Sequence, residues 1–244
     1  MVTLNTEVPL LKVENLHAGY GKLEVVSDVS FHVCAGEFVT MLGRNGAGKS
    51  TTVQAISNLL TKTQGRITFG GEEITKAPPR NIARLGLSQV LQGHRVFTSL
   101  TVEDNLLLGT YIHNRRGDRT KLERVYDLFP ELADRKDQFA SRLSGGQQQI
   151  LAVAQGVISE PSMLILDEPS GGLAPIVVDK ILMIASRLTR EENVAVLLIE
   201  QLIEKSLAHS DRVYVLETGK IAHSGPAKDL RDSDVLLKAY LGGH

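Results

Sequence analysis

Gly43-Arg44-Asn45-Gly46-Ala47-Gly48-Lys49-Ser50-Thr51 is the stretch that decides the fold of this chain. Four of its residues satisfy the spacing G-x-x-x-x-G-K-[ST], namely Gly43, Gly48, Lys49 and Ser50. Glycines let the backbone bend so that successive N–H groups point toward a bound anion. The amine of Lys49 suits the β and γ phosphates of a nucleotide, and the hydroxyl of Ser50 suits Mg²⁺. The motif predicts a loop that holds a nucleoside triphosphate.

The sequence on either side of this loop agrees with that prediction. Residues 37–42 form an apolar run that indicates a short buried strand entering the loop. A helix is predicted over 51–60, with Val53, Ile56, Leu59 and Leu60 on one face. The alternative is a flexible glycine-rich turn that happens to precede a lysine. A strand before the loop and a helix after it favour the nucleotide site.

Composition limits the classes of function. The 27 basic and 28 acidic residues give a net charge of −1, which argues against a broad basic surface for nucleic acid. Cys34 is the only cysteine, so no intramolecular disulfide can form, and a reducing, cytoplasmic setting is expected. The N-terminus lacks the pattern of a signal peptide, and the longest apolar run spans only 194–199. Any association with a membrane is therefore expected to go through a partner.

Periodicity and turn signals predict a chain that alternates strand and helix at both ends and is helical in between. Strands are expected at 11–16, 25–33, 37–42, 65–69, 87–91, 163–166, 195–199, 212–217 and 220–223. Further helices are expected at 79–85, 101–112, 121–129, 144–159, 176–190 and 234–240, with turns at 17–21 and 70–71 and an exposed link at 114–120. We predict one domain over 1–244, with an α/β core in 1–92 and 161–244 and a helical subdomain in 93–160.

Leu143-Ser144-Gly145-Gly146-Gln147 opens the helix predicted at 144–159. Ser144 and Gln147 fit the pattern S-x-x-Q of a capping box, which is a purely structural role. The same helix end can also bind a phosphate, because two glycines expose its first N–H groups and the Ser144 hydroxyl is free to turn outward. Both interpretations stay open, and both can hold at different stages of a cycle.

Asp167 and Glu168 follow the apolar run 163–166, which is typical of a central parallel strand. Two adjacent carboxylates at a strand end are costly unless something cationic meets them. Because neighbouring side chains on a strand point in opposite directions, we expect different roles for the two. Asp167 suits Mg²⁺ through its water shell, and Glu168 suits deprotonation of an attacking water.

Taken together, these motifs resemble those of ATP-binding subunits of the ABC transporter superfamily, from about residue 10 to the end of the chain. Residues 43–50 match the P-loop, 143–147 the family's signature, and 163–168 the Walker B strand. The resemblance implies an α/β fold: a RecA-like P-loop NTPase core with a mainly parallel sheet, an N-terminal antiparallel β subdomain and a helical insertion. It also implies that Tyr20 stacks on adenine and that Gln92 meets Mg²⁺ and the attacking water.

Several departures from the family pattern narrow the resemblance to one branch. Ala174 stands where an aspartate is usual, Gln201 where the switch histidine is usual, and Gln155 where an arginine is frequent. With the segment 92–97 and the ending 239–243, the departures at Ala174 and Gln201 are similar to the importers of branched-chain amino acids, and within them to the second ATPase subunit (LivF-like). Gln155 bears on the local charge network instead. Gln201 can donate an N–H to the γ phosphate, but it cannot ionise as histidine can.

The resemblance implies ATP and Mg²⁺ as cofactors and a site shared by two subunits. ATP held by Lys49 of one subunit would be closed over by Ser144, Gly145 and Gly146 of the other, which is either a homologous ATPase or another copy. The pair would sit on the cytoplasmic face of the membrane against two permease subunits, with a solute-binding protein acting indirectly.

Three other interpretations differ from this one in class or in cargo. A soluble ABC-type ATPase of DNA repair or translation would carry tandem cassettes, coiled-coil inserts or a basic surface, and none is visible. A GTPase would need an Asn-Lys-x-Asp motif to recognise the base, and the sequence has none. A small-molecule kinase has no use for the motif at 143–147. A transporter of another solute, such as urea or a short-chain amide, stays open because the ATPase subunit does not touch the cargo.

Overall fold

The computed structural model describes residues 8–93, 95–113 and 119–232. The helix predicted at 234–240 and the ending 239–243 lie outside the described residues, as does most of the link predicted at 114–120. Within the described ranges, no helix is both long and apolar enough to span a membrane.

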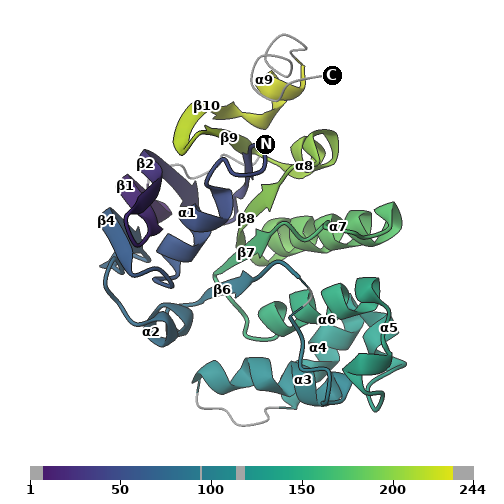
Figure 1. Ribbon diagram of the computed structural model, residues 1–244. Coiled ribbons are helices and arrows are strands. Elements are labelled where there is room, and N and C mark those ends of the chain that lie inside the picture. Colours follow the sequence, from purple (N-terminus) through teal and green to yellow (C-terminus); the bar gives the residue numbers. More distant parts are fainter. Residues whose placement is uncertain (1–7, 94, 114–118, 233–244) are drawn as a thin grey trace.

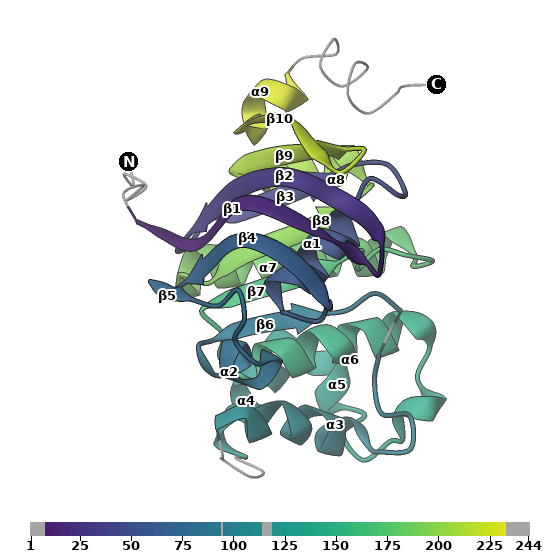
Figure 2. The same ribbon diagram turned by 60° about the vertical axis from the view of Figure 1, so that its left-hand side comes forward.

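The strands form two sheets (Figures 1 and 2). The antiparallel sheet has the order β2 (Leu23–Cys34), β1 (Pro9–Tyr20), β4 (Lys62–Phe69), β5 (Glu72–Glu73). The larger sheet has the order β10 (Lys220–Pro226), β9 (Arg212–Glu217), β3 (Phe38–Leu42), β8 (Ala195–Glu200), β7 (Met163–Asp167), β6 (Leu87–Val90). All neighbouring pairs in the larger sheet are parallel except β9 with β10. The predicted parallel core and N-terminal antiparallel unit are both confirmed.

The helices cover both faces of the larger sheet. They are α1 (Lys49–Ile56), α2 (Pro79–Arg84), α3 (Val102–Gly109), α4 (Thr120–Leu128), α5 (Pro130–Ala133), α6 (Gly145–Val157), α7 (Pro175–Glu192), α8 (Ile203–His209) and α9 (Ala227–Arg231). In the described ranges, short 3-10 helices follow α3 at Thr110–His113 and precede α6 at Ala140–Arg142. Figure 1 shows α3, α4, α5 and α6 gathered at one end of the molecule, beyond β6. The subdomain boundaries at 93 and 160 stay a prediction.

Strand alternation explains how the larger sheet is buried on both sides. On β7 and β8, Ile165 and Ile199 belong to the apolar cluster shared with α1 and the antiparallel sheet. Leu166 and Leu198 belong to the cluster shared with α3, α4, α6 and α7. The next residue on each strand continues the alternation, so Asp167 lies on the α1 side and Glu200 on the α7 side. The face of the sheet on which each carboxylate lies decides which groups it can contact.

Two local predictions are corrected by the structure. Helix α1 ends at Ile56 rather than 60, because Asn58 adopts a left-handed φ of 50° that terminates the helix. Leu59 therefore leaves the apolar face and is 50% exposed. The turn predicted at 17–21 is mostly strand, because β1 keeps pairing with β2 as far as Tyr20 and Leu23.

Candidate functional site

The loop between β3 and α1 has the backbone that the P-loop motif requires. Gly46 and Gly48 have φ values of 81° and 103°, which are costly for residues with a Cβ. A Cβ on Gly43 would lie 2.5 Å from the carbonyl oxygen of Leu216 on β9. The glycines are therefore needed both for the turn and for its close approach to the sheet.

Lys49 begins α1 and is almost fully buried at the floor of this loop. Its Nζ donates to the carbonyl oxygens of Gly43 and Arg44, at 2.9 and 3.3 Å. The same Nζ lies 3.1 Å from Oε1 of Glu168. The P-loop lysine and the carboxylate after β7 thus form an ion pair, which brings two predicted site residues together.

Ser50 and Asp167 also meet. The Ser50 hydroxyl donates to Oδ1 of Asp167 at 3.1 Å, and Asp167 is only 3% exposed. Burial raises the pKa of Asp167, the Ser50 hydrogen bond lowers it, and the nearby charge of Glu168 raises it. A carboxylate in this setting favours a cation beside it.

Glu168 is held by amides on both sides. Its Oε2 accepts a hydrogen bond from Nε2 of Gln92 at 2.9 Å, and its Oε1 accepts one from Nε2 of Gln201 at 3.0 Å. Glu168 adopts a left-handed φ of 45°, and its N–H donates to the carbonyl of Ile199. Strained backbone of this kind is frequent at functional sites.

These residues surround an open cavity of about 230 Å³. It is lined by Val25, Asn45, Gly46, Gly48, Lys49, Ser50, Thr51, Gln92 and Glu168. Gly43, Arg44 and Gln201 line an adjoining cavity of about 390 Å³, and Ala47 is buried behind the loop. Val25 was not singled out from the sequence, because a valine in a strand carries no signal of a site.

Tyr20 and the signature are not among the residues that line that cavity. Tyr20, at the end of β1, is 48% exposed, and its hydroxyl donates to Oε1 of Gln54 on α1. Ser144–Gln147 stands at the start of α6, which both views place away from α1 (Figures 1 and 2). Among the described residues, no hydrogen bond or ion pair joins 144–147 to the P-loop.

The signature forms the predicted capping box. The N–H of Gln147 donates to the Ser144 hydroxyl at 3.3 Å, and the N–H of Ser144 donates to Oε1 of Gln147 at 2.9 Å. A Cβ on Gly146 would lie 3.1 Å from Cγ2 of Val177, so the helix end also packs closely against α7. Gly145 precedes it at the first position of the helix.

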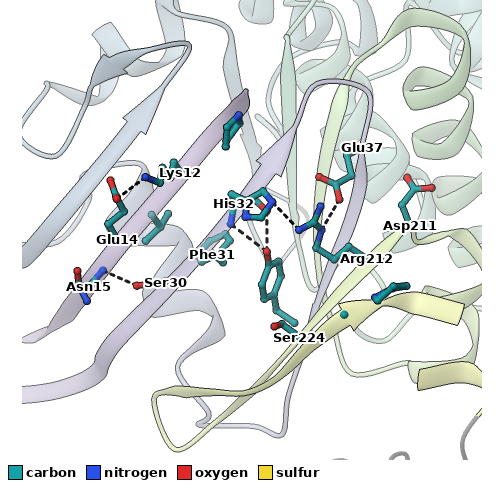
Figure 3. Close-up of a pocket in the computed structure, with 15 residues that line it drawn as sticks. Lys12, Glu14, Asn15, Ser30, Phe31, His32, Glu37, Asp211, Arg212 and Ser224 are labelled. Atoms are coloured by element: carbon teal, nitrogen blue, oxygen red, sulfur yellow. Dashed lines mark hydrogen bonds and ion pairs between the residues drawn. The ribbon is translucent and has the colours of Figure 1, made fainter. Parts of the chain in front are cut away.

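A larger cavity, about 850 Å³, lies elsewhere, between the antiparallel sheet and the β9–β10 hairpin (Figure 3). The charged groups that line it have partners, either in the cavity or, for Asp211, in Arg190 outside it. Arg212 donates through Nε to Oε1 of Glu37 at 2.7 Å and through Nη1 to Nε2 of His32 at 2.7 Å. Lys12 pairs with Glu14 at 2.6 Å. Because the charged side chains that line this cavity already have partners in the described part of the chain, the smaller P-loop cavity is the better candidate site.

Arg212 is expected to stabilise the fold. Arg212→Ala would leave the Glu37 carboxylate, 6% exposed, without a cation. We expect a cost of about 3 kcal/mol in the free energy of unfolding, at the lower end of the range for buried pairs because Arg212 itself is 26% exposed. The matched control is Arg190→Ala, whose half-exposed pair with Asp211 should contribute about 0–1 kcal/mol. Urea unfolding measures both, and equal losses for the two variants would contradict this assignment.

His32 is expected to make stability depend on pH. Burial lowers the pKa of His32, and the charge of Arg212 lowers it further. The unfolded chain then binds more protons below its own pKa of about 6.5, so stability should fall as the pH drops from about 7.5 to about 5.5. His32→Gln keeps an acceptor for Arg212 and cannot titrate. Urea unfolding across this range should show a shallower slope for His32→Gln, and an unchanged slope would refute the assignment.

Comparisons with known proteins agree with the site. The model of the ABC transporter family matches residues 26–171, more than half of the chain. The branched-chain amino acid transport ATP-binding protein BraG of Pseudomonas aeruginosa is 40% identical over 96% of this chain and 100% of its own. The probable branched-chain amino acid transport ATP-binding protein LivF of Archaeoglobus fulgidus is 33% identical over 96% of this chain and 99% of its own length. The lipopolysaccharide export system ATP-binding protein LptB of Haemophilus influenzae is 32% identical over 96% of this chain and 97% of its own length.

A solved structure shows the same fold over nearly the whole chain. The nucleotide-free ATP-binding cassette of an ABC transporter superposes with a TM-score of 0.84 at 25% identity, covering 97% of this chain and 100% of that one. Fold and site together define a P-loop nucleotide-binding ATPase. The chain belongs to the ABC transporter family, as an ATP-hydrolysing subunit.

Proposed function

We propose that this chain couples ATP hydrolysis to the uptake of branched-chain amino acids, as a peripheral subunit on the cytoplasmic face of the membrane. It would work as one of two ATPase subunits bound to two membrane-spanning permease subunits, with a solute-binding protein delivering the cargo. The names of BraG and LivF, two relatives that match over almost their full lengths, support this cargo.

The P-loop cavity suits the phosphates of ATP together with Mg²⁺. The left-handed glycines leave room for phosphates beside the backbone N–H groups, and Lys49 supplies the charge. Ser50, Asp167 and Gln92 offer oxygen ligands, which Mg²⁺ prefers, and the buried Asp167 carboxylate lacks a cation partner among the described residues. When bound there, Mg²⁺ would neutralise charge on the β and γ phosphates.

Glu168 is the proposed general base, and its surroundings are the observation that carries the proposed mechanism. Gln92 and Gln201 hold the two oxygens of its carboxylate at hydrogen-bond distance beside the cavity. A carboxylate held in this way can orient a water and accept its proton. Gln201 also has an N–H with which to reach the γ phosphate, and Tyr20 is the proposed platform for adenine.

The signature is proposed to act on the nucleotide of the partner subunit. Its helix end is far from its own P-loop, yet it exposes N–H groups at Gly145 and Gly146 that suit an anion. The Ser144 hydroxyl, now bound to Gln147, would turn to the partner's γ phosphate and complete the electrostatic stabilisation there.

A different cargo is the second candidate, because LptB is nearly as similar to this chain as LivF is. Urea, short-chain amides and other amino acids are further possible cargoes, since the ATPase subunit does not touch the solute. A soluble ATPase outside transport is the weaker alternative, and salt-sensitive binding to DNA or ribosomes would support it.

The cargo is tested by purifying the chain with its membrane subunits in lipid and measuring ATP hydrolysis with the solute-binding protein. Leucine, isoleucine or valine on the binding protein should stimulate hydrolysis over the unloaded protein. Stimulation by urea or a short-chain amide alone would replace the proposed cargo. Lack of response to any solute, with stimulation by lipopolysaccharide, would support an export role instead.

A further inference from the structure

Glu200, the last residue of β8, is a buried carboxylate without an ion pair in the described part of the chain. It is 2% exposed. Strand alternation turns it away from the P-loop and toward the segment that follows β7. Burying a carboxylate is costly unless hydrogen bonds satisfy it. Its contacts therefore indicate what it is there to hold.

Each oxygen of Glu200 binds the backbone of a different segment. Oε1 accepts a hydrogen bond from the N–H of Ser170 at 3.1 Å. Oε2 accepts one from the N–H of Gln201 at 2.9 Å and one from Leu202 at 3.4 Å. Hydrogen bonds from N–H groups to a charged acceptor are stronger than those between neutral groups. Glu200 thus ties the segment after β7 to the segment after β8.

These two segments carry the residues that meet at the reaction centre. Ser170 lies two positions after Glu168, and Gln201 donates from Nε2 to Oε1 of Glu168 at 3.0 Å. The two segments also border an open cavity of about 410 Å³, so packing leaves space on one side of them. The hydrogen bonds of Glu200 therefore connect Ser170, just after Glu168, with Gln201, whose side chain binds Glu168 in turn.

We propose that Glu200 is a positioning residue for ATP hydrolysis, which fixes the distance between Glu168 and Gln201. This inference rests on the proposed role of Glu168 as the general base. A glutamine at 200 has one carbonyl oxygen, and its NH₂ group would face an N–H, so it can hold only one of the two segments. An aspartate keeps both oxygens but is one methylene shorter.

The test compares Glu200→Gln, Gln201→Ala and the double variant, with the exposed Glu204→Gln on α8 as the matched control. Steady-state ATP hydrolysis gives kcat and KM, and calorimetry gives the affinity for ADP. We expect kcat of Glu200→Gln to fall about tenfold, the loss of one charge-assisted hydrogen bond, with ADP affinity changed less than about twofold. The double variant should match Gln201→Ala within about twofold, since Glu200 acts through the Gln201 contact.

The inference would be overturned if kcat of Glu200→Gln stayed within about twofold of the wild type. It would also be overturned if the kcat losses of the two single variants multiplied in the double variant, or if Glu200→Gln lost ADP affinity by the same factor as kcat. If Glu200→Gln does not fold, Glu200→Asp replaces it under the same criteria, with an expected loss of about threefold. Glu168→Gln is assayed in parallel. An active Glu168→Gln would refute the proposed base, whereas an inactive one beside a normal Glu200→Gln would refute this inference alone.

Discussion

Replacing Glu168 by glutamine should lower the rate of ATP hydrolysis about 10²–10⁴-fold, the range typical of losing a general base. Glutamine preserves the shape of the side chain and can still bond to Gln92 and Gln201, so the surrounding loops should stay in place. What it loses is the ability to accept a proton from water. We expect ATP to stay bound and to trap a closed dimer.

The ion pair between Lys49 and Glu168 adds a second expectation for this variant. Without nucleotide, Glu168→Gln leaves the buried Lys49 ammonium with carbonyl partners only, so its melting temperature should fall. With ATP and Mg²⁺, the phosphates replace the missing carboxylate, and the melting temperature should rise at least as much as in the wild type. Hydrolysis and thermal melting with Glu204→Gln as control measure both effects. Undiminished hydrolysis in Glu168→Gln would disprove the assigned role.

Replacing Lys49 by alanine should weaken nucleotide binding about 100-fold, or about 2.7 kcal/mol. The ammonium is the buried cation of the P-loop cavity, and charge-assisted hydrogen bonds to phosphate are among the stronger polar contacts. The variant also leaves Glu168 without its ion pair, so the segment after β7 loses one of its contacts.

Calorimetry with ADP and Mg²⁺ measures this loss, and Lys76→Ala, an exposed lysine before α2, is the control. The control should bind ADP like the wild type. If Lys49→Ala also did so, the cavity beside Lys49 would not be the phosphate site, whatever the motif indicates.

Much of the fold could be predicted because periodic apolar patterns coincide with buried strands and helices. The strand before the P-loop and the run 163–166 became β3 and β7, both fully buried. Prediction failed where the backbone conformation of one residue, or a contact distant in sequence, decides the outcome. The end of α1 depends on one left-handed asparagine, and the extension of β1 to Tyr20 depends on pairing with β2. Helices α8 and α9 were missed because each is a short helix of 7 or 5 residues.

The site was predictable to the level of its motifs but not of its contacts. The sequence placed Lys49 and Glu168 in one site, yet no spacing rule says that they pair directly without a nucleotide. Nor does spacing say that Gln92 and Gln201, 109 positions apart, hold opposite oxygens of the same carboxylate. Glu200 was passed over because a glutamate at a strand end has no motif. Its importance appears only when both loops are seen to bind it.

We propose that each ATP site is shared between the P-loop of one subunit and the signature of another. Sedimentation velocity of Glu168→Gln, alone and mixed with any second ATPase found in the purified transport complex, tests this most directly. ATP with Mg²⁺ should produce a dimer in at least one sample, and adding Ser144→Arg to this chain should abolish that dimer while ATP binding persists. Monomers in both samples at saturating ATP, or a dimer indifferent to Ser144→Arg, would contradict the shared site.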